Sequence, residues 1–304
     1  MWYNINGDNM KVLSTGLAAY DITLRLDEYP KENSKNRLKE SIECGGGPAA
    51  TAACTLAKYG VDVSFAGVVG ADLYGMRVKE ELKEFGIDTK YLQISSNCTT
   101  PVAHILVNKQ NGSRTVLTVK DKKSMELVDI DFYPDYILID GQEEEFSKKV
   151  IADFPNAKVI IDAGSYREPV ISLCHLVDYI VCSFDFLSGF SDSPIKTKDE
   201  LIKTYIKVMN LYNKKLIVTL GEYGSMYYDN EVKFVKSIKV DTIDTTGAGD
   251  IFHGAFIYGL INNMPIDEIL KFANIAGALS VLTVGGRNSI RSLEEVKKVY
   301  EQYR

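Results

Sequence analysis

The sequence predicts an α/β fold in which a mostly parallel central sheet is flanked by helices and carries a small β-sheet lid. Between residues 136 and 220, short apolar runs alternate with helical segments, which is typical of βαβ units in a sheet buried on both faces. Two earlier stretches, 17–43 and 92–120, alternate apolar with polar residues, as strands do when one face of their sheet is wet. A chain of 304 residues can bury one large core with a small appendage.

Composition excludes several classes of function. The net charge of −6 and the pI near 5.3 argue against a nucleic-acid partner or an anionic membrane surface. The amino terminus lacks the basic and apolar regions of a secretory signal, and the most apolar stretch, 272–286, is too short to cross a bilayer. The five cysteines are scattered without a C-x-x-C pair, so we expect no disulfide framework or zinc site, and a cytoplasmic location.

The first half of the chain is expected to contribute to both sheets. It begins with a polar arm, 1–10, to which no role is assigned. Pro48 suits the first turn of a helix and Gly60 suits the position after its end, so an alanine-rich helix is expected between them. Asn111 and Gly112 are a pair that turns a hairpin. The other expected elements are strands over 11–16, 17–29, 34–44, 61–69, 93–97, 101–108 and 114–120, and a helix over 72–85.

The second half of the chain predicts the main body of the core. Ser292 and Glu295 form a capping box at the start of the last helix. We therefore expect a core domain of 11–16, 44–91 and 121–304, and a lid of 17–43 and 92–120. The expected elements are strands over 136–139, 158–161, 179–182 and 215–220 with helices after them, two short antiparallel strands within 224–240, and helices over 248–262, 266–283 and 292–303.

The segment from Asp244 to Asp250 contains the clearest chemical signal. Gly247, Ala248 and Gly249 follow a strand-like segment and open a helix, where the first backbone N–H groups have no partner within the helix. Small residues let an anion approach these groups, and Asp250 places a carboxylate beside them. Such a pairing suits phosphoryl transfer, although a helix capped by an aspartate after a glycine turn would look similar.

The longer string, Asp244 to Asp250 followed by Phe252 and Gly254, resembles the carboxy-terminal signature of the PfkB/ribokinase family of carbohydrate kinases. The resemblance spans nearly the whole chain and implies a ribokinase-like fold whose lid closes over a sugar. It also implies that Asp250 is the catalytic base and that the amides of Gly247, Ala248 and Gly249 form an anion hole. In several members the lids pair, so the resemblance allows a homodimer through the lid.

The glycines at 45–47 are expected on the sugar side of the site. This stretch does not fit a dinucleotide-binding motif. A polar-faced segment precedes the glycines, and the spacing from them to the next acid is poor for such a site. The stretch resembles instead the family's Gly-Gly-x-x-x-Asn signature, which gives Gly46 and Gly47 to the sugar and places Thr51 where the family has Asn. A glycine-rich turn into a helix without any ligand is the alternative. Asp21 matches the family's sugar-binding acid, although a lone strand aspartate can also be a solvated edge residue.

The nucleotide side is expected near the ends of later strands. Thr219, Gly221 and Gly224 resemble the family's ATP loop, although they also suit an ordinary turn after a strand, and Asn274 matches its adenine-side Asn, although an internal cap would satisfy it too. The family's Asn-x-x-Glu motif for Mg²⁺ is absent. Ser183 and Asp185 stand in its place, a variant resembling ketose kinases, and could act through water.

Several weaker candidates complete the expected site. Arg167 could meet an anionic group on either substrate or simply start a helix on the surface. His104 and Asp140, at strand ends that face the expected cleft, are further candidate sugar contacts. By resemblance to potassium-dependent relatives, K⁺ or another monovalent cation is expected at Asp244, Thr246, Ser280, Thr283, Gly285 and Ser289.

Together these residues predict an ATP- and Mg²⁺-dependent kinase that phosphorylates a primary hydroxyl of a small sugar, either fructose-like or ribose-like. Two alternatives stay open. One is a nucleoside kinase of the same fold, and the other is a sugar-sensing protein without catalysis.

Overall fold

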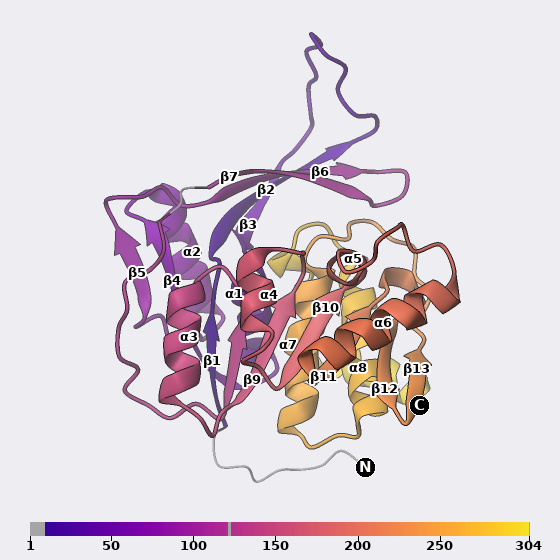
Figure 1. Ribbon diagram of the computed structural model, residues 1–304. Coiled ribbons are helices and arrows are strands. Elements are labelled where there is room, and N and C mark those ends of the chain that lie inside the picture. The colour runs from indigo at the N-terminus through magenta and orange to yellow at the C-terminus, as the bar shows by residue number, and fades with distance from the viewer. Residues whose placement is uncertain (1–9, 121–122, 304) are drawn as a thin grey trace.

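A computed structural model describes residues 10–120 and 123–303 of the protein, so the polar arm expected over 1–10 lies, except for Met10, outside the described residues. The described chain forms a nine-stranded sheet and a separate four-stranded sheet, which confirms the predicted α/β fold (Figure 1). In the large sheet, the strands from β11 to β5 pair in parallel. The pairs β11–β12 and β12–β13 are antiparallel. Its strands, in spatial order, are β13 (Glu231–Val235), β12 (Ser225–Asp229), β11 (Lys215–Thr219), β10 (Tyr179–Ser183), β9 (Lys158–Ala163), β8 (Tyr136–Ile139), β1 (Lys11–Thr15), β4 (Asp62–Gly70) and β5 (Leu92–Ser95).

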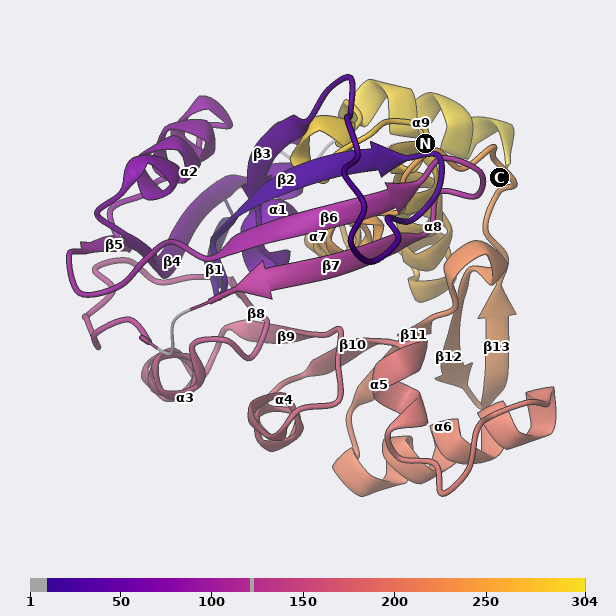
Figure 2. The ribbon, with the colours of Figure 1, turned by 90° about the horizontal axis from the view of Figure 1, so that it is seen from above.

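Helices cover both faces of the large sheet (Figures 1 and 2). One face is covered by α1 (Pro48–Lys58), α2 (Leu73–Glu84), α7 (Ala248–Ile261), α8 (Ile266–Ser280) and α9 (Leu293–Gln302). The other face is covered by α3 (Glu144–Asp153), α4 (Glu168–Leu173), α5 (Phe184–Ser188) and α6 (Lys198–Tyr212). The capping box expected at the start of α9 is formed by Ser292 and Glu295. Within the described part of the chain, no helix is both long enough and apolar enough to cross a bilayer.

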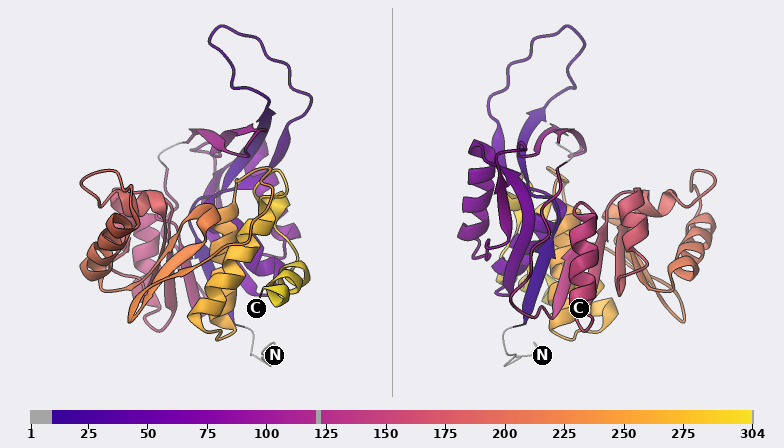
Figure 3. Two further views of the ribbon diagram at one scale, coloured as in Figure 1. Left: turned by 90° about the vertical axis from the view of Figure 1, so that its right-hand side faces the viewer. Right: turned by 60° about the vertical axis from the view of Figure 1, so that its left-hand side comes forward.

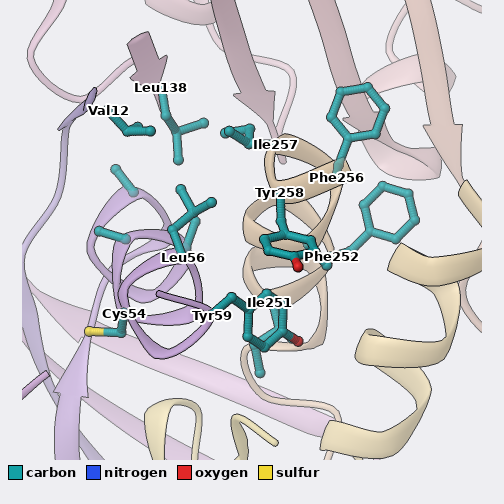
Figure 4. Close-up of a cluster of buried hydrophobic side chains, with 14 of the residues drawn as sticks. Val12, Cys54, Leu56, Tyr59, Leu138, Ile251, Phe252, Phe256, Ile257 and Tyr258 are labelled. Atoms are coloured by element: carbon teal, nitrogen blue, oxygen red, sulfur yellow. The ribbon is translucent and has the colours of Figure 1, made fainter. Parts of the chain in front are cut away.

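Strand alternation explains why the apolar runs are continuous. Val12 and Leu138 point into the cluster beneath α1 and α7, where they meet Leu56 and Ile257 (Figure 4). The next residue along β1, Leu13, points into the opposite cluster beneath α3 to α6. Because successive side chains of a strand face opposite ways, a sheet with two covered faces needs apolar residues at both.

The small sheet lies over the end of the large sheet at which β1 ends (Figures 1 and 2). Its strand order is β3 (Ile42–Gly46), β2 (Ala19–Leu26), β6 (Val102–Asn108) and β7 (Arg114–Val119). The β6–β7 pair is the hairpin predicted from Asn111 and Gly112. The connection between β2 and β3, residues 27–41, extends away from both sheets (Figure 3).

The membership of the small sheet differs from the expected lid at three places. The strand Leu92–Ser95 was expected in the lid but pairs in parallel with β4 in the large sheet. Its alternation arises because it is an edge strand with one partly exposed face. Cys44 to Gly46, expected in the core, pair with β2 in the small sheet. Residues 34–41, expected to be part of a strand, form no strand, so only the end of the predicted segment is extended and paired.

Gly47 joins the small sheet to the core. It has φ of +95°, a conformation that favours glycine, and it precedes α1 directly. A Cβ built on Gly47 would lie 2.1 Å from the carbonyl oxygen of Leu17, which belongs to the connection between β1 and β2. Two of the crossings between core and small sheet, β1 to β2 and β3 to α1, therefore pass each other at a distance that excludes any side chain.

We expect Gly47→Ala to lower the free energy of unfolding by about 3 kcal/mol, because it adds both backbone strain and a steric clash. Gly60→Ala is the matched control, since Gly60 has φ of +83° but no atom within 4 Å of its Cβ position. It should cost only about 1 kcal/mol, the strain alone. Urea unfolding of both variants measures the difference, and equal losses would contradict the close approach.

Candidate active site

The turn before α7 is shaped by two glycines. Gly247 has φ of +77°, and a Cβ there would lie 2.9 Å from the Cα atom of Gly286. The turn can therefore close against the 285–286 segment only with glycine at 247. Gly249 is exposed, and no atom of the described residues lies within 4 Å of its Cβ position. One side of the turn is thus tightly packed and the other is open.

The backbone amides of this turn face the open side. Ala248 donates to the Thr245 carbonyl at 3.4 Å, and Ile251 donates to the Gly247 carbonyl at 2.9 Å. In the described chain, the amides of Gly249 and Asp250 donate to no backbone carbonyl. Because the amino end of a helix also carries partial positive charge, these amides make a binding place for an anion.

Asp250 lies half-buried in the first turn of α7, beside these amides. The loss of hydration raises the pKa of its carboxyl to about 7, and repulsion from Asp162 adds to this, while His253 and Arg114 act in the opposite direction. A carboxyl with a pKa near neutrality is well matched to accept a proton from a hydroxyl during a reaction.

Asp21 projects from β2 and is 8% exposed. Its carboxyl fills the space next to Gly46, where a Cβ would lie 2.2 Å from Oδ1. Burial raises the pKa of Asp21 to about 6, against the effect of Arg287. The charge of Asp21 also contributes to the raised pKa of Asp250, so a carboxyl carried by the small sheet acts on a carboxyl carried by α7.

His104 does not join Asp21. In the register of β2 and β6, Asp21 is the neighbour of Ala103, and His104 is the neighbour of Ile22. Neighbouring residues of paired strands share a face, so His104 lies on the opposite face of the small sheet and is exposed. We expected His104 to contact the sugar on the same face as Asp21. That expectation was wrong, because the residue of β6 on that face is Ala103 and His104 is the next residue along the strand.

The glycine-rich end of β3 rests on a buried arginine. Arg287, in the short helix η2 (Arg287–Ser289), donates from Nη2 to the Gly46 carbonyl at 2.8 Å. Its Nη1 lies 3.5 Å from Oε2 of Glu81, which also accepts from the Gly45 amide. A Cβ on Gly45 would lie 2.0 Å from Nη1, so glycine is needed for the guanidinium to approach.

Asp140 braces the core instead of presenting a free carboxylate. It is buried, and it accepts hydrogen bonds from the amides of Leu17 at 2.9 Å, Gln142 at 2.9 Å and Ala49 at 3.3 Å. These amides occupy both oxygens, so the structure favours a positioning role over the direct sugar contact that we expected. Arg167, half-buried nearby, donates from Nη2 to the Asp140 carbonyl at 3.3 Å.

Thr51 lies in the first turns of α1 and is 1% exposed. Its amide donates to the Gly47 carbonyl at 2.9 Å. Thr51, which stands where the family has Asn, is therefore next to the sugar-side glycines, but its side chain is buried where α1 packs against the core.

The two glycines after β11 have different roles. Gly224 is buried with φ of +99°, and a Cβ there would lie 2.0 Å from the carbonyl oxygen of Val235 in β13. Gly221 begins the short helix η1 (Gly221–Tyr223), is exposed, and has open space at its Cβ position. Thr219 donates to the Cys182 carbonyl at 3.3 Å. Of these two glycines, Gly221 is the one that leaves room for a ligand to approach the backbone.

Asn274 is buried and ties α8 to the antiparallel strands. Its Nδ2 donates to Oγ of Ser225 at 3.1 Å and to the Val235 carbonyl at 3.0 Å. Both amide hydrogens are therefore in use, which favours the structural alternative for this residue over the adenine contact that we expected.

Ser183 and Asp185 differ in availability. The Ser183 hydroxyl donates to the Gly164 carbonyl and accepts from the Phe186 amide, both at 3.0 Å, so it caps α5. Asp185 is exposed at the start of α5 and leaves its carboxylate available to ligands. Within the ranges described here, no group of three or more histidine, cysteine or acidic side chains forms a metal site.

The residues expected around a monovalent cation do come together. Asp244 accepts from the Thr246 amide and hydroxyl, at 2.8 and 2.6 Å, and from the Gly285 amide at 2.9 Å. The hydroxyls of Ser280 and Ser289 donate to the carbonyls of Gly277 and Gly286. Thr283 accepts from Arg291 at 2.7 Å. These bonds use the side chains, so any cation here would depend on backbone carbonyls.

Three residues at the site were not singled out from the sequence. Arg114 of β7 donates to both the carbonyl and the hydroxyl oxygen of Thr245, at 2.9 and 2.8 Å, and so ties the small sheet to the turn before α7. Asp162 ends β9, and His253 lies one helical turn after Asp250. The position of Asp162 at a strand end was a usable signal, whereas nothing in the sequence places Arg114 near residue 245.

The chain is similar to known proteins over nearly its whole length. The family model described as pfkB family carbohydrate kinase matches residues 9–293. The chain is 26% identical to a ribokinase of Bacillus subtilis (strain 168), with 93% of this chain and 97% of the relative covered. It is 27% identical to a deoxyribokinase of Salmonella typhi (94% and 97% covered) and 21% identical to a nucleoside kinase of Methanothermobacter thermautotrophicus (96% and 96%).

Solved structures show the same fold. The ribokinase of Thermotoga maritima superposes with a TM-score of 0.79 at 27% identity, and the match covers 97% of this chain and 100% of that chain. The ribokinase of Arabidopsis thaliana, solved with ribose and ATP, gives a TM-score of 0.79 at 23% identity, covering 96% and 99%.

The raised pKa of Asp21 makes a prediction about stability. Between about pH 4 and pH 6 the folded protein holds a proton on Asp21 that the unfolded chain releases, so stability falls as pH rises through this window. We expect Asp21→Asn to raise the free energy of unfolding by about 1–3 kcal/mol at neutral pH and above, with the gain vanishing near pH 4. Urea unfolding at both pH values measures this. Asp27→Asn, at an exposed position, is the control. A loss of stability for Asp21→Asn at high pH would contradict the predicted cost of this charge.

Proposed function

Because the chain belongs to the pfkB family of carbohydrate kinases, we propose that it transfers the γ-phosphoryl group of Mg·ATP to a primary hydroxyl of a small sugar, either fructose-like or ribose-like. Phosphotransfer to an alcohol acceptor is the activity of this family. The observation that carries the proposal is the position of Asp250, a carboxyl with a pKa near 7 beside open amides at the start of α7.

In the proposed reaction, the acceptor lies between Asp21 of the small sheet and Asp250 of the core. Asp21 and the backbone at Gly46 and Gly47 would accept and orient the sugar hydroxyls, supported from behind by Arg287. Asp250 takes the proton of the attacking hydroxyl. The open amides at the start of α7, those of Gly249 and Asp250, stabilise the charge that spreads over the transferred group.

The nucleotide is proposed to lie along the loop from Thr219 to Gly224, with its phosphates directed at α7. Gly221 supports this, since the backbone there is exposed and unobstructed. The free carboxylate of Asp185 fits a magnesium ion held mainly through water, while Ser183, being a helix cap, does not. When bound with ATP, magnesium neutralises phosphate charge.

A monovalent cation such as K⁺ is proposed between the 244–246 and 280–289 segments. Asp244 holds these segments together by accepting from Gly285 and Thr246. A homodimer through the lid is also proposed. Val116, Leu117 and Val119 of the edge strand β7 are exposed, and an unpaired strand with apolar side chains favours a second copy as its partner.

A nucleoside acceptor is the second candidate. It is favoured by the similarity, over 96% of both chains, to the nucleoside kinase of Methanothermobacter thermautotrophicus. A nucleoside also presents a primary hydroxyl, so the roles of Asp21 and Asp250 would be unchanged.

We expect Asp250→Asn to lower kcat by about 10²–10⁴-fold, since a positioned base typically contributes that much. ATP affinity should stay near that of the unchanged protein, because the amides of the turn remain. The unfolding midpoint should not fall, because the substitution removes a buried charge whose pKa is raised in the folded protein. A coupled ADP-release assay and calorimetric titration with ATP measure the two effects. Undiminished turnover would remove Asp250 from the reaction.

A panel of acceptors tests the substrate class. Ketoses, pentoses and nucleosides are assayed for ADP release with ATP and magnesium, each with and without K⁺, and Asp250→Asn serves as the blank. We expect one free sugar to give the highest kcat/KM and K⁺ to raise it. A nucleoside as best acceptor would favour the second candidate. If none of the acceptors in the panel is phosphorylated, both candidates are contradicted.

A further inference from the structure

A second ionisable side chain lies in the first turns of α7, three residues after Asp250. His253 is buried, and both of its ring nitrogens have a partner. Nδ1 lies 2.7 Å from the carbonyl oxygen of Gly249, and Nε2 lies 3.0 Å from the carbonyl oxygen of Val181 in β10. The imidazole thus joins the anion-binding turn to the centre of the large sheet.

The two carbonyl partners determine how many protons the His253 ring must carry. A carbonyl oxygen only accepts hydrogen bonds, and a neutral imidazole has a single N–H to donate. In the neutral form, one ring nitrogen would direct a lone pair at a carbonyl oxygen 2.7 or 3.0 Å away. Only the doubly protonated imidazolium satisfies both contacts. A half-turn of the ring would place carbon atoms at 2.7 and 3.0 Å from the two oxygens, which is closer than a C–H···O contact allows.

A buried counter-charge stands beside the ring. Oδ2 of Asp162, at the end of β9, lies 3.3 Å from Nδ1, and both side chains are 5% exposed. In the described residues this Oδ2 has no hydrogen-bond partner. A buried carboxylate oxygen without a hydrogen bond is costly unless a cation is next to it, and His253 is placed to be that cation.

We propose that His253 is a positioning residue that works as a permanent imidazolium, holding the peptide between Gly249 and Asp250 in the orientation that phosphoryl transfer needs and balancing the charge of Asp162 behind the catalytic base. The proposal rests on the function proposed above. In a planar trans peptide the C=O and N–H bonds point in opposite directions. Nδ1 draws the Gly249 carbonyl inward, so the Asp250 amide is directed outward, to the open side of the turn.

The imidazolium also belongs to the set of charges around the base. Asp250 is faced by Asp162 from β9, His253 from its own helix, Arg114 from β7 and Asp21 from β2. Asp162 and Asp21 raise the pKa of Asp250, and His253 and Arg114 lower it. Asp162 in turn is faced by His253 and by Arg167. Removing His253 or Asp162 should therefore move the pKa of Asp250 in opposite directions.

The first test reads the protons directly and needs no turnover. The chain has only three histidines, so ¹⁵N-histidine labelling gives three resolvable rings. We expect one ring to keep both N–H protons at about pH 8, where an ordinary histidine is neutral. His253→Asn assigns that signal, and if this variant does not fold, the pair His104→Gln and His175→Gln assigns it by elimination. A His253 ring with one unprotonated nitrogen at that pH would overturn the proposal.

The second test uses the pH profile of kcat/KM. His253→Asn should move the acid limb to higher pH, because Asp162 then acts on Asp250 without its counter-charge, and Asp162→Asn should move it to lower pH, each by about one unit. A side chain that only fills space would move both limbs the same way or not at all, and either result would overturn the proposal. If no acceptor is phosphorylated, the proposed function fails, while the labelling test still decides the charge of His253.

Discussion

The crowding of negative charge at one edge of the sheet is the constraint on which this site depends. Asp21, Asp162 and Asp250 converge from three elements, and burial raises the pKa of each. Repulsion from Asp162 and Asp21 raises the pKa of Asp250 further. The structure places basic side chains behind two of these carboxyls. Arg287 lies behind Asp21 and His253 lies behind Asp250, both buried. In the proposed reaction, the open amides of the turn would meet the negative charge of the nucleotide beside these acids.

Close backbone approach joins the parts that carry these charges. Gly47 passes the Leu17 carbonyl, Gly247 touches Gly286, and Gly45 leaves space for Arg287. The hairpin of the small sheet reaches the same region, since the Thr245 amide donates to the Gly112 carbonyl and Arg114 donates to Thr245. The turn that would hold the phosphoryl group is therefore supported by the small sheet as well as by the core.

The sequence was informative where the signal is local. The βαβ alternation, the hairpin at Asn111 and Gly112, the capping box at Ser292 and the turn before Asp250 depend on neighbours in the chain, and all are present as predicted. Features that depend on distant partners were not predictable. The register of β2 against β6 sets the face of His104, and partners more than 80 residues away set the environments of Asp140 and Arg287. An edge strand such as β5 alternates like a strand of the small sheet, because both have one partly wet face.

The division of the two acids between the small sheet and the core has a consequence for how such a protein can change. Asp21 belongs to the four-stranded appendage, whereas Asp250 belongs to the helix that starts beside the anion-binding turn. If the proposed reaction holds, substitutions along β2, β3 and β6 would remodel acceptor recognition without touching the groups proposed to move the proton and the phosphoryl group. Such an architecture would separate diversification of the acceptor from preservation of the chemistry.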